Sequence, residues 1–357
     1  MFRPKSPYIP SGTTANALAT TGASVNVSNA APPSIGKTLQ AESGTVASWQ
    51  YARLLNVKLS GAVGDDTSFD TTALATNDIT ALAAGLQNYF PKGTYKVSGT
   101  VVFSAPCIFD VGAIIHVTAG SITFNSGVTA EIAQILNLES GVTASFSRQK
   151  TLVGYAEWFG AVSNSSGTDS LAAIQLAINS LAQVQLLGAA YYTSGVLTHG
   201  VTGGTLKGAT VMGSVATAVS AGITSIVCTS GSTNIINIGT STNGQCIKKI
   251  NFTRNIAPVI SSACIGVHIK QTGSLVIEDC MSNESMIGFK VGDGVAATSW
   301  STINRCRAKR TLVGSGAGTD TFIGFWMLGT TTFGNTSTYL DHCYVGTSDA
   351  FETAAYD

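Results

Sequence analysis

The sequence predicts an all-β protein whose main part is a right-handed parallel β-helix, a fold in which successive coils of chain stack along one axis. One supersecondary unit occurs twice in the chain, and a short apolar–polar phrase then recurs about every 26 residues. The composition agrees with this fold: 44% of the 357 residues are hydrophobic, only 11% are charged, and 39 are glycine. Stacked coils need many tight turns, which glycine and short polar residues favour.

Residues 1–50 are expected to form an extended N-terminal anchoring segment and not a folded domain. They are rich in Ser, Ala, Thr, Asn and Pro, and large apolar side chains are few before Trp49 and Tyr51. Such a segment buries too little apolar surface to offset its conformational entropy, so we expect it to become ordered on a partner or on sister chains.

The repeated unit divides the remaining chain into two parts. Residues 51–152 are expected to form a β-rich neck that contains the first copy, and residues 153–357 the opening coils of the β-helix. Two copies of one unit at nearly constant spacing indicate a modular, stacked architecture. The matching segments are Gly61–Asp65 (GAVGD) with Phe159–Val162 (FGAV), and Tyr89–Val102 (YFPKGTYKVSGTVV) with Val184–Leu197 (VQLLGAAYYTSGVL).

Each copy is expected to contain one helix, the first less regular than the second. In the first copy, Ile79, Leu82 and Leu86 recur at helical spacing. In the second, a short capping helix is predicted from an apolar stripe, with Thr168 or Asp169 as its N-cap. The stripe consists of Leu171, Ile174, Ile178 and Leu181. Strands of the first copy are predicted at 100–103, 107–111, 114–117, 121–124 and 130–138.

A ladder of similar phrases begins near residue 234 and is the strongest structural signal. Its steps are 27 residues (250 to 277), 26 (277 to 303) and 37 (303 to 340), and the last step needs a loop at Gly314–Asp320 or Gly329–Thr336. The phrase occurs as Ile277–Cys280 (IEDC), Ile303–Cys306 (INRC) and Leu340–Cys343 (LDHC), with a looser forerunner at Ile250–Phe252 (INF). A second phrase accompanies it at Ile265–Val267 (IGV), Ile287–Phe289 (IGF) and Ile323–Phe325 (IGF).

Composition and motifs exclude several classes of function. The formal net charge is zero, so no electrostatic footprint for nucleic acid is present. No apolar run approaches the ~20 residues of a membrane helix, and the N-terminus lacks the apolar core of a signal peptide. The seven cysteines contain no Cys-x-x-Cys pair, so we expect reduced core residues and no zinc site. We expect no cofactor, no metal and no catalytic residue in these 357 residues.

The segment from Glu157 through Val162 (EWFGAV), with Asp169 and the Ala/Ile-rich stretch Leu171–Ile178, resembles the entry of bacteriophage tailspike and tail-fibre β-helices of the pectate-lyase-like superfamily. The loop Ser163–Asp169 departs from the Gly/Asp-rich loop of that family, whereas the first copy keeps Gly64–Thr67 (GDDT). The resemblance covers residues 54–357. It is specific for architecture and not for activity, because fold does not fix function. It implies a trimeric virion appendage whose N-terminus docks to the tail.

The ladder places two sets of polar residues in columns. Glu278, Asn304 and Asp341 are expected to form one outward column, and they are candidates to face a glycan together with His342. Asp279, Arg305 and His342 form the adjacent bend column, which is most simply a neutralising charge ladder. Coils ~4.8 Å apart put Glu278 and Asp341 ~10 Å apart, outside the range of a glycosidase acid pair. His116, His199 and His268 have no partnered motif and are assigned to surface or strand positions.

These observations predict a structural component of a phage tail appendage that attaches to the tail and recognises host-surface glycan. The expected partners are two sister chains in a homotrimer, a tail, adaptor or baseplate protein bound by residues 1–50, and bacterial surface polysaccharide. The expected location is the virion tail, after synthesis in the host cytoplasm. A capsule or O-antigen depolymerase, glycosidase or lyase, is the alternative, and a secreted pectate-lyase-like enzyme is a third. The few coils predict that the chain is part of a longer polypeptide.

Overall fold

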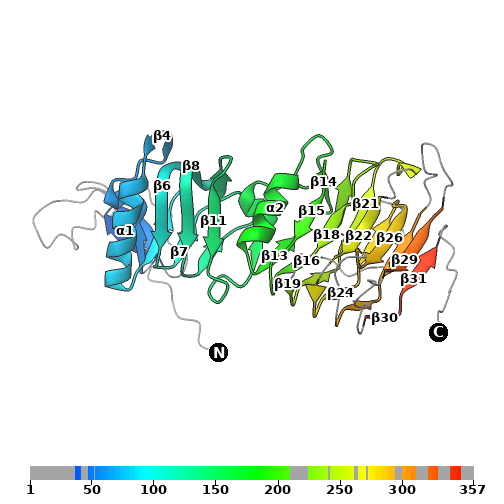
Figure 1. Ribbon diagram of the computed structural model, residues 1–357. Coiled ribbons are helices and arrows are strands. Elements are labelled where there is room, and N and C mark those ends of the chain that lie inside the picture. Colours follow the sequence, from blue (N-terminus) through cyan, green and yellow to red (C-terminus); the bar gives the residue numbers. More distant parts are fainter. Residues whose placement is uncertain are drawn as a thin grey trace, which may run out of the picture.

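The protein is an elongated rod of stacked parallel strands (Figure 1). The computed structural model describes residues 37–41, 47–51, 53–209, 224–239, 242–260, 264–270, 272–293, 300–310, 321–328 and 338–346. Of the predicted N-terminal segment, this includes only an antiparallel pair, β1 (Lys37–Ala41) and β2 (Ala47–Tyr51). Both loops proposed for the long ladder step lie outside the described residues. The predicted parallel β-helix is confirmed by the strand pairings.

The C-terminal unit consists of three parallel sheets, named here A, B and C, whose strands alternate along the chain. Each of the five turns from β13 to β29 contributes one strand to each sheet, which is the defining pattern of a β-helix. Sheet A contains β12 (Gly154–Tyr155), β13 (Gln183–Leu186), β16 (Thr205–Gly208), β20 (Cys246–Lys248), β24 (Val276–Glu278), β27 (Thr302–Asn304) and β30 (Tyr339–Asp341). Sheet B contains β14 (Ala190–Thr193), β17 (Ser225–Cys228), β21 (Asn251–Arg254), β25 (Met281–Asn283), β28 (Arg307–Lys309) and β31 (Tyr344–Gly346). Sheet C contains β15 (Leu197–His199), β18 (Ile236–Ile238), β22 (Ile265–Ile269), β26 (Ile287–Val291) and β29 (Ile323–Met327). A short pair, β19 (Thr242–Asn243) and β23 (Thr272–Gly273), lies beside them.

The N-terminal unit is also built from parallel strands, arranged in two sheets. Two of the separately predicted strands, 114–117 and 121–124, are parts of the single long strand β8. One sheet contains β3 (Leu54–Asn56), β5 (Gln87–Phe90), β7 (Cys107–Phe109) and β9 (Val128–Ala130). The other contains β4 (Asp65–Phe69), β6 (Gly93–Phe103), β8 (Ala113–Phe124), β10 (Leu136–Leu138) and β11 (Thr143–Phe146).

The two sequence copies have the same local design. In each, a short 3-10 helix ends at a left-handed glycine, Gly61 (φ 94°) or Gly160 (φ 90°), and a loop leads to an α-helix. The residue before the helix ties down that loop: the Asp70 carboxylate accepts from Val63 N–H, and the Ser170 hydroxyl bonds to Val162. The helices of the described residues are η2 (Val57–Ser60), α1 (Thr71–Ala84), η3 (Ala156–Phe159) and α2 (Leu171–Ser180).

Two local predictions about the helices are wrong in detail. Helix α1 exposes Ile79 and Leu82 and is longer than α2; it buries two polar residues, which bond to neighbouring loops, together with Leu74 and Ala81. The N-cap of α2 is Ser170, although Asp169 accepts a hydrogen bond from the Leu171 N–H. The buried polar residues of α1 are Asn77 and Asp78.

The first phrase of the ladder begins three residues earlier than predicted. Ile247, and not Ile250, pairs with Ile277, so that step spans 30 residues (247 to 277). The Ile250–Phe252 phrase was misleading because Ile250 occupies the inward position that Cys280 occupies in the next coil.

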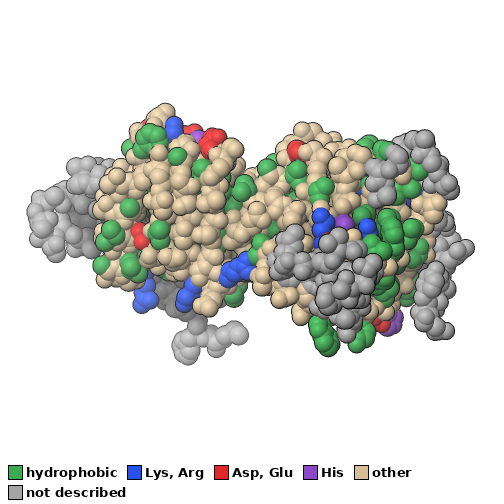
Figure 2. Space-filling model, viewed as in Figure 1, with side chains coloured by type: hydrophobic (Ala, Val, Ile, Leu, Met, Phe, Trp, Pro, Cys, Tyr) green, Lys and Arg blue, Asp and Glu red, His purple; other side chains and the backbone are tan. Residues whose placement is uncertain are grey.

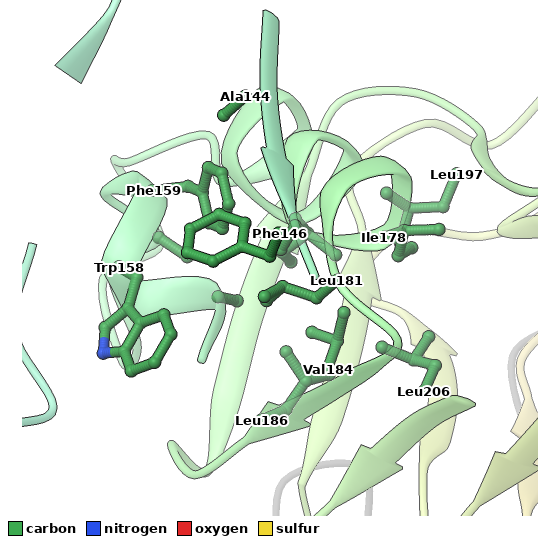
Figure 3. Close-up of a cluster of buried hydrophobic side chains, with 14 of the residues drawn as sticks. Ala144, Phe146, Trp158, Phe159, Ile178, Leu181, Val184, Leu186, Leu197 and Leu206 are labelled. Atoms are coloured by element: carbon green, nitrogen blue, oxygen red, sulfur yellow. The ribbon is translucent and has the colours of Figure 1, made fainter. Parts of the chain in front are cut away.

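The core runs without interruption through both units. In the N-terminal unit it is a chain of aromatic rings in which Phe103, Phe124 and Phe146 stack with centroids 5.3 and 4.7 Å apart. At the junction Phe146 contacts Trp158 and Phe159, and α2 covers the end of the C-terminal coils (Figures 1 and 3). Burial of such large apolar surfaces stabilises the rod and couples the two units.

Glycines in sheet C permit a close approach of sheets B and C inside the rod. A Cβ added to Gly266 would lie 1.8 Å from Ser282 Oγ, and one added to Gly288 would lie 2.6 Å from Ala308 Cβ. At Gly324 the added atom would lie 2.3 Å from Val345 Cγ2. The glycine of the repeated IG(V/F) phrase is therefore required by packing at the same position in three successive coils.

We predict that Gly288→Ala destabilises the protein by about 1–3 kcal/mol, since the new methyl group overpacks a site with no free volume. The matched control is Gly167→Ala, where an added Cβ has no neighbour within 4 Å. Urea unfolding of both variants measures the difference. Equal stability of the two variants would contradict the inward assignment of the phrase.

Candidate functional site

The predicted outward column of sheet A is confirmed by the strand register. Glu278 pairs with Asn304, and Asn304 pairs with Asp341, so the three residues occupy equivalent positions in successive coils. Lys248 occupies the same position in the preceding coil. Neighbouring parallel strands lie about 4.8 Å apart, so each side chain can reach only the residues of the adjacent coils.

The predicted bend column is also present, and its backbone conformation explains it. Asp279, Arg305 and His342 have φ values of 54°, 50° and 49°, and Lys249 has 58°. Left-handed residues other than glycine are uncommon, and here one recurs at the same corner of four coils. The turn directs the chain from sheet A into sheet B, which fixes the spacing between the outward residue before it and the inward residue after it.

Ion pairs neutralise most of the charge of these two columns. Arg305 Nη2 lies 2.6 Å from Glu278 Oε1, and its Nε lies 2.6 Å from Asp279 Oδ1. Lys248 Nζ lies 2.7 Å from Glu278 Oε2. Glu278 therefore has a cation on both oxygens, and these bonds, first that from Lys248 and then that from Arg305, hold its pKa below the usual range. A carboxyl group with a lowered pKa stays ionised and is a poor general acid.

The last described coil has a separate acid–base pair. His342 Nδ1 lies 2.6 Å from Asp341 Oδ1, and both side chains are exposed. Between this pair and Glu278, Asn304 has a buried Oδ1 atom without a hydrogen-bond partner. The four candidate residues Glu278, Asn304, Asp341 and His342 thus lie on neighbouring coils of one face.

The cysteines that follow the bend lie inside the rod. Cys280 and Cys306 are completely buried and Cys343 is partly buried, and all seven cysteines of the chain are free, as the sequence predicts. The Cys306 thiol lies 3.7 Å from the Ile277 carbonyl of the preceding coil. Burial is the main cause that raises the pKa of Cys306, so this thiol remains protonated and unreactive at neutral pH.

His116 lies on strand β8, as expected, but it has two carboxylate partners that no sequence motif indicates. Its Nδ1 lies 2.6 Å from Asp66 Oδ1 and its Nε2 lies 3.1 Å from Glu139 Oε1. With a carboxylate at each ring nitrogen the imidazole is held as a double donor, and these bonds, led by that from Asp66, raise its pKa. Lys96 pairs with His116 in register, and its ammonium lies 5.4 Å from the centre of the exposed Phe69 ring. Figure 2 shows these charge types together on the N-terminal unit.

The other two histidines are buried strand residues. His199 is neutral because burial lowers its pKa to about 4, and neither ring nitrogen has a hydrogen-bond partner. His268 bonds through Nε2 to the Gly292 carbonyl at 3.3 Å and lies 3.5 Å from the Asn234 amide through Nδ1. Burial is the main cause that lowers its pKa.

Two cation–aromatic pairs on the C-terminal coils were missed in the sequence. Lys290 Nζ lies 4.8 Å from the centre of the Trp326 ring in sheet C, and the Arg307 guanidinium lies 5.8 Å from the Tyr344 ring in sheet B. Each pair joins equivalent positions of adjacent coils. Alignment of the phrases IGFK and IGFW places Lys290 and Trp326 at the same position, so the sequence itself predicts that these two residues are neighbours on adjacent coils.

The described residues contain no group of three or more His, Cys, Asp or Glu side chains that could hold a metal ion. Within the same part of the chain, no helix is long and apolar enough to cross a membrane.

Several solved structures match the chain across most of its length. They include the A-module of the mannuronan C-5 epimerase AlgE4 of Azotobacter vinelandii (14% identity, TM-score 0.33), which covers 82% of this chain and 95% of its own. The ORF18 protein of Geobacillus virus E2 has 11% identity and a TM-score of 0.39, covering 86% and 68%. The tailspike of Acinetobacter baumannii phage AM24 has 11% identity and a TM-score of 0.25, covering 91% and 50%.

No protein-family model and no curated protein matches the sequence. The structural matches include a phage tailspike and a mannuronan C-5 epimerase. Their identities and TM-scores are too low to assign a function. The β-helix of this chain is established by its own strand pairings.

We predict that Cys280 and Cys306 react with a thiol reagent only after denaturation, because both side chains are completely buried and the reagent cannot reach them. Cys306→Asp should abolish folding, since it would bury an unpaired charge. The matched control is Asn304→Asp, two residues away on the outer face. Rapid labelling of Cys280 and Cys306 in the native protein would show that the inward and outward positions are exchanged.

We predict that the His116 cluster stabilises the protein more at acidic than at alkaline pH. A histidine with a raised folded pKa contributes stability that is fully present below its unfolded pKa of about 6.5 and is lost as the pH rises through the folded pKa. Because Asp66 and Glu139 are about half exposed, screening keeps the effect near 1 kcal/mol or less.

The measurement is the difference in melting temperature between the wild type and His116→Gln at pH 5.5 and pH 9. The difference in melting temperature should be larger at pH 5.5 than at pH 9. This dependence on pH should vanish when both proteins also carry Asp66→Asn and Glu139→Gln. A difference that is independent of pH in the first comparison would contradict the prediction.

Proposed function

We propose that this chain is a component of a bacteriophage tail appendage whose β-helix binds bacterial surface polysaccharide. The observation that carries the proposal is the rod itself, on which outward side chains recur at fixed spacing along parallel columns. A polysaccharide is also a repeating polymer, and a column of equivalent positions offers it successive contacts without any change of the backbone. The EWFGAV entry and capping helix, which resemble those of phage tailspikes, support the viral assignment.

The outer surface has the chemistry that sugars require. Aromatic rings provide flat apolar faces for pyranose rings, and the pairs Lys290–Trp326 and Arg307–Tyr344 put such rings on adjacent coils beside cations. On sheet A, Glu278, Asn304, Asp341 and His342 offer hydrogen-bond donors and acceptors, and we propose that they contact the glycan as secondary partners.

We further propose that three copies of the chain assemble around one axis and that residues 1–50 dock to a tail protein. A rod with few charged residues is suited to contact sister chains along its side, and closed cyclic symmetry satisfies every such interface. Deletion of residues 1–50 is then expected to leave the trimer intact in native mass spectrometry and to abolish incorporation into virions. A native mass of one chain, with or without the deletion, would contradict the trimer.

The ionisation of Glu278 favours binding over cleavage. A glycosidase needs one carboxylic acid that stays protonated until it donates its proton, whereas the cations at Glu278 stabilise its ionised form. We therefore propose that residues 1–357 bind glycan without hydrolysing it.

The test is incubation of the purified protein with a panel of capsular and O-antigen polysaccharides. We predict binding without new reducing ends or unsaturated products. Glu278→Gln and Asp341→Asn are expected to change stability only slightly. Cleavage by the wild type that either substitution abolishes would establish the depolymerase instead, and absence of binding to every polysaccharide of a known host would contradict the proposed function.

A further inference from the structure

The charges on sheet C differ in one respect from those on sheet A. On sheet A the carboxylate of Glu278 has two cationic partners, and Asp341 has His342. On sheet C the two lysines at the outer face, Lys270 and Lys290, make no ion pair with any residue that the structure describes. Figure 2 shows a histidine between basic side chains on the face that carries β22 and β26.

His268, Lys290 and Trp326 form one column across three successive coils. His268 pairs in register with Lys290, and Lys290 pairs with Trp326, so the three side chains occupy equivalent outward positions. Lys270 follows β22 directly, and both lysines are near enough to His268 to act on its charge. We name Lys270, Lys290 and Trp326 the lysine–tryptophan surface.

His268 is the floor of this surface and adds no charge to it. It is only 7% exposed, and its Nε2 N–H donates to the Gly292 carbonyl while Nδ1 faces the Asn234 amide. This arrangement fixes the neutral form, which the two neighbouring lysines also favour. Asp293 is the acidic residue nearby, and it has interactions of its own. The positive charge at the surface therefore comes from the two ammonium groups.

The Lys290 ammonium lies near a flat aromatic ring and makes no ion pair with a described residue. Its distance of 4.8 Å from the Trp326 ring centre is that of a cation–π contact. At a partly exposed site such a contact is weak, so the ammonium can bond to an incoming anion while it remains beside the indole. A sugar that has a carboxylate or sulfate group next to an apolar ring face satisfies both side chains at once.

We propose that the lysine–tryptophan surface binds an anionic polysaccharide, with the acidic group on Lys290 or Lys270 and the sugar ring against Trp326. The proposal rests on the proposed function and specifies its ligand class. It favours a glycan over nucleic acid because two lysines on a chain of zero net charge do not form the basic stripe that nucleic acid requires.

The test measures the affinity of the purified full chain for polygalacturonate, for dextran of similar length and for single-stranded DNA, at low and high salt. Polygalacturonate should bind best, and its affinity should fall as salt screens the lysines. Lys290→Gln should weaken it about tenfold, the loss of one charged hydrogen bond. Trp326→Ala should weaken it more than Trp326→Phe does. Lys207→Gln, at an outward position of sheet A, is the matched control and should leave the affinity unchanged.

The outcomes separate this inference from the proposed function. Equal binding of dextran, or equal loss in Lys207→Gln and Lys290→Gln, would overturn the lysine–tryptophan surface while leaving a glycan-binding rod. Single-stranded DNA that binds as tightly as polygalacturonate would show a general anion surface and would overturn the glycan assignment. Retained folding of each variant is checked by its melting temperature, and loss of binding in folded Trp326→Ala and Lys290→Gln variants, with binding retained in Trp326→Phe, supports the proposal.

Discussion

The structure depends on one constraint, the in-register pairing of each strand with the equivalent strand of the next coil. Ile247, Ile277 and Ile303 form one inward column in sheet A because each pairs with the next. A slip by one residue would turn every inward side chain to the surface, so the buried columns fix the register strongly. Once the inward columns are fixed, the outward residues must also form columns, and the surface chemistry repeats with the coils.

This repetition brings like and unlike charges to a distance at which they interact strongly, about 4.8 Å between coils. On sheet A the Glu278 carboxylate lies between the cations of Lys248 and Arg305 on the adjacent coils, and Arg305 also bonds to Asp279. On sheet C the column instead goes from an imidazole to an ammonium to an indole, and the charge has no internal partner among the described residues. We take this difference to separate a face that stabilises the rod from a face available to a ligand.

Much of the fold could be predicted from the sequence because a β-helix repeats its signal. The phrases IEDC, INRC and LDHC correctly predicted the outward column, the bend and the buried cysteines. The prediction failed where one coil departs from the repeat, as at Ile250, which resembles the start of a phrase but fills the cysteine position. It also missed the partners of His116, because Asp66 and Glu139 lie 50 and 23 residues away and belong to no repeated phrase. Lys290 and Trp326 follow the second phrase at the same position, so the sequence contains the signal for their pairing.

The most direct test of the account is a crystal structure of the protein with a bound uronate oligosaccharide. The account predicts a carboxylate of the ligand at ion-pair distance from Lys290 and a sugar ring against Trp326, while the ion pairs of Glu278 with Lys248 and Arg305 remain unchanged. An oligosaccharide that lies along Glu278 and Asp341 on sheet A, with the outer face of sheet C empty, would contradict it.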